Sequence, residues 1–409
     1  MPLKSLKVLD FSTLLPGPYA TMMLADLGAE VVRVEAPNRV DLLRHLPPLL
    51  GEGENQTSAC FATLNRNKRA MALDLKNPAA VEAIKRMIGD YDILVEQFRP
   101  GVMARLGLGY DELARINPRL IYCSITGYGQ NGSHRDRAGH DINYLALSGL
   151  AGYSGRAETG PVLSGTQIAD IAGGSHQAVV GILAAVIERQ QSGQGQAIDI
   201  SMADGSLAMN ALFGANSLVS GKDPQLSSEF LNGGSFYGYY RTADDRYLSV
   251  GSLESPFLKG LLQALGKPEW AGRASDTRPE AVEAFKADIQ SIIETQSLRH
   301  WSEVFAELDV CVEPVLSFSE AAASELFRSR EMLVEVPLAE RQSGQQPESL
   351  SNQQRVRQIG CPIKFSRSRA EYRSIGSPLG AHTRDVLREQ GFSDEQIERM
   401  LAAADQTNA

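Results

Sequence analysis

Residues 6–37, LKVLDFSTLLPGPYATMMLADLGAEVVRVEAP, contain the pattern that decides the predicted fold. The apolar run LKVLDF predicts a strand, and the helical spacing of the apolar residues in YATMMLADLGA predicts a helix. The run EVVRVEAP then predicts a second strand. A strand, a helix and a further strand in this order form a βαβ unit, in which the two strands lie parallel.

The turn after the first predicted strand indicates what this βαβ unit can bind. It lacks the sequence GxGxxG, which marks a dinucleotide site, so no nicotinamide or flavin cofactor is expected. The turn reads LLPGP and places Pro16, Gly17 and Pro18 at the carboxyl end of the strand. Ligands of open α/β sheets bind at that end.

Further helices and strands alternate along the first half of the chain. Residues 78–98 and residues 111–129 each contain a helical pattern that leads into an apolar strand. Residues 173–190 predict a strongly apolar helix, and residues 194–202 predict the strand after it. This alternation predicts an α/β fold with a mostly parallel sheet. Near the end of the chain, SDEQIERM predicts a helix capped by Ser393.

A length of 409 residues predicts two domains. Residues 217–234 are polar and rich in glycine, proline and serine, as expected of a linker. Residues 236–253 contain two strand-like runs joined by the turn ADD. A candidate second domain therefore begins after the linker.

The composition argues against several classes of function. The net charge of −9 opposes general binding to nucleic acid, which requires a basic field. Neither a secretory signal nor a membrane-spanning apolar run is evident, so a cytoplasmic protein that does not bind membranes is expected. The four cysteines and six histidines are scattered without the spacing of metal or redox sites, so no metal is expected.

Asp170 is the leading candidate for chemistry. It lies before a glycine-containing helix start, where backbone amides near Gly173 and Gly174 would favour its charged form. The alternative is an ordinary helix-capping aspartate. His140 can act as a general acid or base, although a lone histidine more often has a structural role. Asp141, next to it, is expected to cap a helix.

Charged residues elsewhere suggest a binding site for an anion. Glu254 lies just past an apolar strand, where binding groups and solvated carboxylates both occur. Arg99 and Arg105 lie in the segment EQFRPGVMARLG. A second basic segment, LNRNKRAMALDLK, contains Arg66, Lys68, Arg69 and Lys76. A site for a phosphate-bearing small ligand and a solvated basic surface both fit this pattern.

Several motifs follow one another along nearly the whole chain: LKVLDF, PGP, ADLGAEVVRVE, LNRNKR, FRPGVMARLGLGY, NPRLIYCSITGYGQ, GHDINY, QIADIAGG, DVCVEPVL and PLGAHTRDVLREQGF. In these motifs the chain resembles the family III CoA-transferase (CaiB/BaiF) superfamily, which includes the α-methylacyl-CoA racemases. The resemblance implies that Asp170, in QIADIAGG, is a catalytic residue of an enzyme that acts on CoA thioesters.

The resemblance implies a large Rossmann-like α/β domain built from both chain ends and a smaller inserted α+β domain. The expected division is residues 1–218 for the first part of the large CoA-binding domain, 219–330 for the small domain with its linkers, and 331–409 for the return to the large domain. Two such chains would form an interlocked homodimer. The implied partners are acyl-CoA and carboxylic acids, without a tightly bound cofactor.

Two reactions are implied by the resemblance. In a transferase, Asp170 attacks an acyl-CoA thioester to give an aspartyl–acyl anhydride and then an aspartyl-CoA thioester, before CoA passes to an acceptor carboxylate. In a racemase, the residues that match His140 and Asp170 exchange the α-proton of the acyl group. A glutamate at the position of Glu254 supports that racemase site.

Transfer is favoured on sequence grounds, with a short or dicarboxylic acyl group such as that of succinyl-CoA. Racemases of branched fatty acyl thioesters line the acyl path with methionine and bulky apolar residues, whereas residues 206–223 contain one methionine and several small or polar residues. Racemisation by His140 and Asp170 is the alternative, because Glu254 completes its set of residues. A CoA-binding protein without catalysis is a third hypothesis.

The resemblance also places the CoA nucleotide along the large domain. The residues expected to contact it are Leu15, Pro16, Leu73, Lys76, Gln97, Phe98, Arg99, Arg105 and Arg137. Relatives often have an arginine just after the second strand, where this chain has Ala36. Arg33 and Arg39 are the candidates to replace that arginine.

Overall fold

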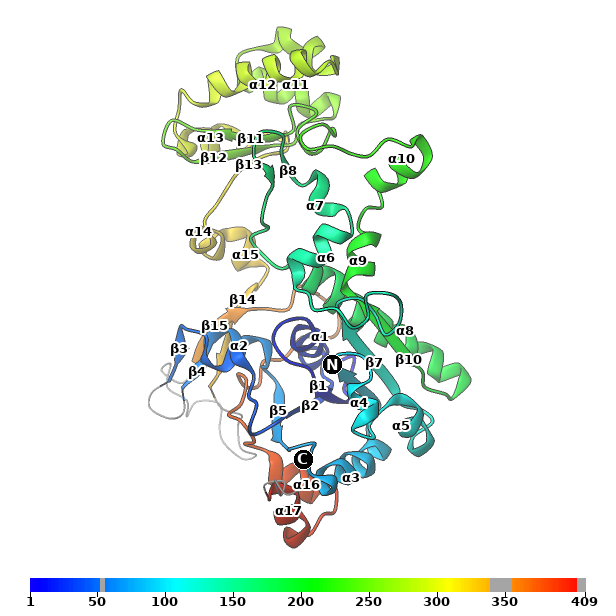
Figure 1. Ribbon diagram of the computed structural model, residues 1–409. Coiled ribbons are helices and arrows are strands. Elements are labelled where there is room, and N and C mark those ends of the chain that lie inside the picture. Colours follow the sequence, from blue (N-terminus) through cyan, green and yellow to red (C-terminus); the bar gives the residue numbers. More distant parts are fainter. Residues whose placement is uncertain (52–55, 339–354, 403–409) are drawn as a thin grey trace. The chain divides into compact units, whose positions relative to one another are not determined.

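The structure is a computed structural model that describes residues 1–51, 56–338 and 355–402. The chain divides into two compact units (Figure 1). The first unit consists of Met1–Tyr144, Thr166–Ser206 and Glu325–Ala409. The second unit consists of Leu145–Gly165 and Leu207–Ser324.

This division differs from the expected one at its boundaries. The second unit runs from Leu207 to Ser324 instead of from residue 219 to residue 330, and it also includes Leu145–Gly165. Hydrogen bonds tie this additional segment to the rest of the unit. Tyr153 Oη donates to Asn210 Oδ1 at 2.9 Å, and Asn232 Nδ2 donates to the carbonyl oxygen of Tyr153 at 2.9 Å. Contacts between segments so distant in sequence leave no signal in composition.

A six-stranded parallel sheet forms the centre of the first unit, in agreement with the predicted α/β fold. Its order is β10-β7-β6-β1-β2-β5. The strands are β1 (Lys7–Phe11), β2 (Glu30–Glu35), β5 (Lys68–Ala72), β6 (Ile93–Glu96), β7 (Ile121–Thr126) and β10 (Ala197–Ser201). The next two strands of this sheet along the chain, β2 and β5, lie on one side of β1. The later strands, β6, β7 and β10, lie on its other side. β1 and β6 therefore flank the topological switch point, where open α/β sheets bind ligands.

Helices cover both faces of this sheet (Figure 1). α1 (Pro16–Asp26) and α8 (Gln177–Ser192) pack on one face. The other face shares its core with α3 (Pro78–Met87), α5 (Tyr110–Ile116), α16 (Thr383–Glu389) and α17 (Asp394–Leu401). Because both faces are covered, a central strand can be buried along its whole length, and all six residues of β7 are buried.

The remaining elements of the first unit are short. They are η1 (Leu42–His45), β3 (Leu49–Leu50), β4 (Thr57–Ser58), α2 (Ala59–Leu64), η3 (Ile88–Asp90), α4 (Val102–Arg105), η4 (Ala169–His176), α15 (Glu325–Ser329), β14 (Leu333–Pro337) and β15 (Arg355–Ile359). Two helices, α6 (Asp141–Leu147) and α9 (Met202–Ala208), begin in the first unit and end in the second. The segments between these elements include the loops that carry most candidate site residues.

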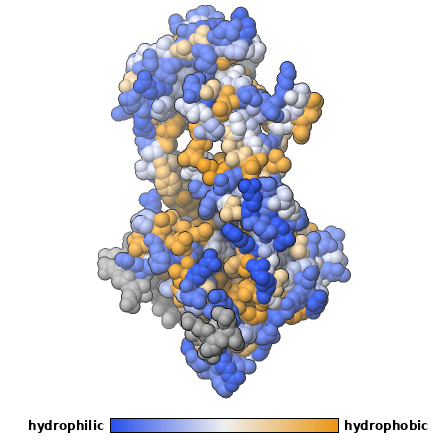
Figure 2. Space-filling model, viewed as in Figure 1, coloured by the Kyte–Doolittle hydropathy of each residue, from blue (hydrophilic) through white to orange (hydrophobic). Residues whose placement is uncertain are grey.

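The second unit is built on a three-stranded antiparallel sheet with the order β11-β12-β13. The two predicted strand-like runs form β11 (Gly238–Arg241) and β12 (Tyr247–Val250), and β13 (Val312–Pro314) pairs with β12. The helices that share its core are α11 (Ser255–Ala264), α12 (Pro279–Ile293) and α13 (Leu298–Phe305). Its other elements are α7 (Leu150–Tyr153), β8 (Gly155–Arg156), β9 (Gly160–Pro161), α10 (Phe213–Ser220), η5 (Pro268–Ser275) and α14 (Phe318–Ala323). Figure 2 shows a largely hydrophilic surface with apolar patches on both units.

η4 and α8 form one continuous helix of 24 residues from Ala169 to Ser192. With a mean hydropathy of 1.4 over its most apolar 18 residues, it is long and apolar enough to cross a membrane, although the sequence analysis expected no such segment. In this structure 39 % of that window is buried, and α8 packs on β7 and β10. The helix therefore belongs to the layer that covers the sheet.

Candidate active site

Asp170 is the second residue of η4, a π-helix. π-Helical turns are rare and are frequent at functional sites. Close backbone packing holds η4 against α9, because a Cβ on Gly205 would lie only 2.4 Å from the carbonyl oxygen of Gly173. Ser175 Oγ also donates a hydrogen bond to the carbonyl oxygen of Pro16 at 2.7 Å. These contacts fix the backbone that carries Asp170.

Asp170 is half-buried and lies beside a second carboxylate. Its backbone N–H donates a hydrogen bond to Asp141 Oδ1 at 3.0 Å. Burial raises the pKa of Asp170 to about 6, the charge of Asp141 acts in the same direction, and His140 opposes them. The sequence analysis expected amides near Gly173 and Gly174 to favour the charged form. That expectation was wrong, because the lost solvation and the neighbouring carboxylate outweigh such amides.

His140 directly precedes α6 and lies in a turn held by its neighbours. Its backbone N–H donates to Asn143 Oδ1 at 3.0 Å, and Tyr144 Oη donates to the carbonyl oxygen of Gly139 at 2.7 Å. The ring of Tyr144 is buried, and a Cβ on Gly139 would lie 2.7 Å from it. The main chain on both sides of the imidazole is therefore fixed, while His140 itself is exposed.

The first unit thus brings His140 and Asp170 close enough for their charges to interact. The helix-capping alternative for Asp170 does not fit, because the N-cap of η4 is Ile168. Glu254, the third predicted catalytic residue, belongs to the second unit. It is exposed, follows β12 and immediately precedes α11.

The residues expected to contact CoA lie in segments that follow the carboxyl ends of four strands. Leu15 and Pro16 follow β1, Leu73 and Lys76 follow β5, Gln97, Phe98, Arg99 and Arg105 follow β6, and Arg137 follows β7. In a parallel sheet these segments share one edge. The exposed members include Lys76, Arg99, Arg105 and Arg137, whereas Pro16 and Leu73 are buried. These four cations therefore lie exposed in loops at the carboxyl edge of the sheet.

The first turn of α1 differs from the helix start of a dinucleotide site. Pro16 and Pro18 lack a backbone N–H, and the N–H of Gly17 donates to Gln97 Oε1 at 3.0 Å. A pyrophosphate normally binds such N–H groups at a helix start. The first turn of α1 therefore lacks the free N–H groups that a dinucleotide site offers.

Three cations of the predicted basic segment are not available to a ligand. Arg66 is buried and its Nη2 lies 2.6 Å from Asp26 Oδ2, and Lys68 is buried with its Nζ 3.2 Å from Asp10 Oδ2. Arg69 pairs with Glu389 at 2.6 Å. The segment does contain a run of basic residues, but ion pairs formed by the fold neutralise these three cations. Lys76 is the exposed member of this segment.

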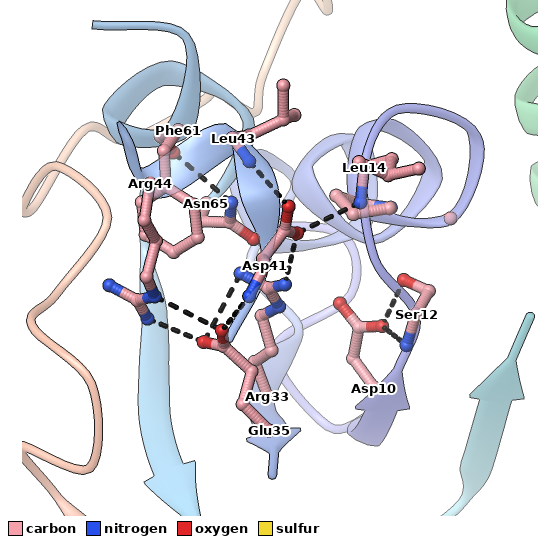
Figure 3. A network of polar contacts seen from close by, with 12 residues as sticks. Asp10, Ser12, Leu14, Arg33, Glu35, Asp41, Leu43, Arg44, Phe61 and Asn65 are labelled. Carbon is pink, nitrogen blue, oxygen red and sulfur yellow. Dashed lines mark hydrogen bonds and ion pairs between the residues drawn. The ribbon is translucent and has the colours of Figure 1, made fainter. Parts of the chain in front are cut away.

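Arg33 is excluded as a ligand for CoA by its own partners (Figure 3). Its side chain is 1 % exposed, and its Nη2 lies 2.6 Å from Asp41 Oδ2. Asp41 Oδ2 also accepts a hydrogen bond from the backbone N–H of Leu14 at 2.9 Å. Leu14 has a positive φ of 60°, which a leucine rarely adopts. The Arg33–Asp41 pair therefore stabilises the loop that leads to Leu15.

Arg39 is the remaining candidate to replace the arginine missing at position 36. Arg39 forms a β-bridge with Ala36, and its backbone N–H donates to the carbonyl oxygen of Ala36 at 3.3 Å. This turn places Arg39 beside Ala36. Arg39 is exposed, and no ion pair to it is found within residues 1–51, 56–338 and 355–402. Its guanidinium is therefore accessible from solvent.

Comparison with known proteins identifies the family. The model of CoA-transferase family III matches residues 3–383. The chain belongs to this family. A solved structure with the same fold is a CaiB/BaiF family protein from Brucella suis, with a TM-score of 0.81 and 28 % identity over 95 % of this chain and 99 % of that one.

Relatives within CoA-transferase family III include enzymes of both expected kinds. The α-methylacyl-CoA racemase of Homo sapiens is 34 % identical over 97 % of this chain and 95 % of its own length. The racemase of Mus musculus is 36 % identical with the same coverage. A succinate–glutarate CoA-transferase of Agrobacterium fabrum is 32 % identical over 97 % of each chain.

Sequence reasoning missed one residue of this family III site. Asp141 was expected to be an ordinary helix cap, but its carboxylate contacts the backbone of Asp170 and raises the pKa of that residue. In the sequence, the position of Asp141 next to His140 was the feature that could have indicated this contact. Across the described ranges, no three His, Cys, Asp or Glu side chains gather as metal ligands do.

Proposed function

We propose that this member of CoA-transferase family III is a racemase that exchanges the α-proton of a 2-methylacyl-CoA thioester. Asp170 and His140 are the two proton carriers in this proposal. The observation that carries it is the pairing of a half-buried carboxyl group, whose pKa is raised to about 6, with an imidazole whose charge influences it. Transfer was favoured on sequence grounds, whereas the raised pKa of Asp170 and the similarity to racemases support the opposite order.

The raised pKa suits a proton carrier better than a nucleophile. A general base works best when its pKa lies near the operating pH, because it must both accept and release the proton. A nucleophilic carboxylate that forms an anhydride must be ionised, and burial beside Asp141 makes ionisation less favourable. The environment of Asp170 therefore favours reversible proton exchange.

The proposed reaction needs one group on each side of the α-carbon. One group removes the α-proton, and the negative charge spreads into the thioester carbonyl. The other group returns a proton to the opposite side, which inverts the configuration. Asp170 and His140 take these two roles, and each takes the opposite role for the other enantiomer. The exposed loop cations are proposed to bind the CoA phosphates.

The family comparisons support the same choice. The human and mouse racemases are more similar to this chain than the Agrobacterium transferase is. CoA transfer remains a second candidate because of one specific observation. Residues 206–223 contain several small or polar side chains, which suit a short acyl group better than a branched fatty one.

Incubation of the protein in deuterium oxide with an enantiopure 2-methylacyl-CoA tests the proposal. We expect deuterium at the α-carbon and loss of optical purity. A parallel incubation contains succinyl-CoA and a panel of carboxylic acids. New thioesters in the second experiment, without deuterium uptake in the first, would establish transfer instead.

Two variants separate the roles of the proton carriers. Asp170→Asn is expected to lower the rate of racemisation by about 10²- to 10⁴-fold while CoA still binds, because Asn cannot carry a proton. His140→Ala is expected to stop racemisation but to leave deuterium exchange for the one enantiomer whose α-proton faces Asp170. Equal loss of exchange for both enantiomers in His140→Ala would contradict the two-carrier mechanism.

A further inference from the structure

A buried carboxyl group lies at the carboxyl end of β6, outside the proposed proton-exchange pair. Glu96 is the last residue of β6 and is 4 % exposed. Its Oε2 accepts a hydrogen bond from the backbone N–H of Phe98 at 2.8 Å, and Ser124 lies beside it in the sheet. A buried acid is costly unless its hydrogen bonds compensate for lost solvation. The bond to Phe98 connects Glu96 to the loop after β6.

Glu96 is part of a polar row across three strands. In the register of the sheet it lies beside Ser124 on β7, and Ser124 lies beside Asp199 on β10. Asp199 Oδ2 accepts a hydrogen bond from the backbone N–H of Gln130 at 2.9 Å. Two carboxylates of one row therefore each bind the main chain of a loop at the carboxyl edge. The loop at Gln130 continues toward His140.

The loop that Glu96 binds is connected to the other side of the switch point. Between Glu96 and Phe98 lies Gln97, whose Oε1 accepts the backbone N–H of Gly17. The next residue, Arg99, is an exposed cation. A loop that is held at Phe98 by Glu96 and at Gln97 by α1 cannot shift without breaking one of these bonds.

We infer that Glu96 is a positioning residue that fixes Gln97, Phe98 and Arg99 in the geometry that binds CoA. The inference rests on the CoA site of the proposed function. Glu96 acts through the backbone of Phe98 and does not touch the ligand. In this role Glu96 contributes to the binding of CoA as well as to the stability of the sheet.

Two substitutions of similar size separate positioning from packing. Glu96→Met fills the same space but cannot accept a hydrogen bond, whereas Glu96→Gln keeps one acceptor oxygen. We expect Glu96→Met to raise the Kd for CoA about 10-fold, because the variant loses the hydrogen bond to the backbone N–H of Phe98. Glu96→Gln should restore the Kd to within about 2-fold of wild type. Calorimetric titration with CoA measures both.

Hydrogen exchange of the peptide that contains Phe98 provides a second readout. The amide of Phe98 should exchange faster in Glu96→Met and at the wild-type rate in Glu96→Gln. The matched control is Asp92→Leu, at the amino end of the same strand, where Asp92 accepts the backbone N–H of Lys7 at 2.9 Å and pairs with Arg189. We expect this control to lower stability without changing the Kd for CoA.

The possible outcomes either support or overturn the role of Glu96. An unchanged Kd in folded Glu96→Met, or equal weakening in both Glu96 variants, would overturn it. Absence of CoA binding by the wild-type protein would also overturn it. Absence of turnover alone would contradict only the proposed reaction, because the Kd for CoA and the hydrogen-exchange rates do not depend on catalysis.

Discussion

The carboxylate of Asp141 accepts a hydrogen bond from the backbone N–H of Asp170 at 3.0 Å, although 29 residues separate the two in the chain. The contact joins the start of α6 to the π-helix η4. It places two acidic groups together in a half-buried site, where their repulsion is weakly screened. The proton affinity of Asp170 therefore depends on a residue that need not touch substrate.

Replacement of Asp141 by Asn should shift the pH dependence of proton exchange. Burial and, after it, the negative charge of Asp141 raise the pKa of Asp170 from 3.8 to about 6; Asn retains the acceptor oxygen for the Asp170 N–H but removes that charge. That pKa should fall, without returning to 3.8, because burial is the larger cause. Asp170 must be ionised to act as a base, so the acid limb of the kcat profile should move to lower pH. An unmoved limb in folded Asp141→Asn would contradict this coupling.

Replacement of Arg33 by Met should destabilise the first unit. Arg33 is 1 % exposed between Asp41 and Glu35, and its loss removes the ion pair of the buried Asp41 carboxylate, whereas Glu35 keeps its pair with Arg44. Breaking a buried ion pair in this way costs about 3–5 kcal/mol in the free energy of unfolding. Urea denaturation measures this cost. Arg33 does not reach the surface, but its pair with Asp41 stabilises the loop that leads to Leu15, so the Kd for CoA of the folded fraction should rise together with the loss of stability.

Replacement of Arg39 by Ala should weaken CoA binding without affecting chemistry. Its exposed guanidinium is expected to interact with a CoA phosphate, so KM should rise about 5-fold while kcat stays constant, which corresponds to about 1 kcal/mol. The effect should shrink at high salt. Arg115→Ala is the matched control, because Arg115 lies in the last turn of α5, which leads toward the amino end of β7. Equal effects of the two substitutions would mean that net charge alone is responsible.

Replacement of Gly205 by Ala should displace η4. The added Cβ would meet the carbonyl oxygen of Gly173 at 2.4 Å and its Cα at 2.6 Å, and both are backbone atoms that cannot rotate away. Overpacking of this kind costs about 1–3 kcal/mol. Because η4 carries Asp170, kcat should fall more than stability alone explains. Gly89→Ala is the control, since nothing lies within 4 Å of a Cβ there.

Replacement of Glu96 by Gln should change how stability depends on pH. Burial raises the pKa of Glu96 from 4.5 to about 7, so the folded state resists its ionisation. As pH rises from 4.5 to 7, the free energy of unfolding of the wild type should therefore fall relative to that of Glu96→Gln. The fall should be about 3 kcal/mol at most. Below pH 4.5 both side chains are neutral and the difference should vanish. Urea denaturation at pH 4 and pH 8 compares them.

Local features of the fold were predictable because they depend on neighbours in sequence. The strand–helix–strand pattern of residues 6–37 became β1, α1 and β2. Ser393 caps α17 as predicted, and its Oγ accepts the backbone N–H of Gln396 at 3.3 Å. Periodicity and capping act within a few residues, so they are visible in the chain itself.

The availability of charge was decided by tertiary contacts. The same basic segment contains buried Arg66 and Lys68 and exposed Lys76, and the sequence gives no sign of this difference. Asp26 and Asp10, which pair with the two buried cations, lie 40 or more residues away. Burial of a charge requires a partner brought in by the fold, and that partner cannot be identified from local pattern.

The sequence by itself determined the α/β fold and, through its ordered motifs, the family, and it singled out Asp170 as the leading candidate for chemistry. Only the tertiary structure decided the chemical character of that aspartate. Its proton affinity follows from burial and from the charges of Asp141 and His140, which reach it across the fold. A pKa is set by solvation and by charges in space, so the same residue in the same motif can serve as nucleophile or proton carrier.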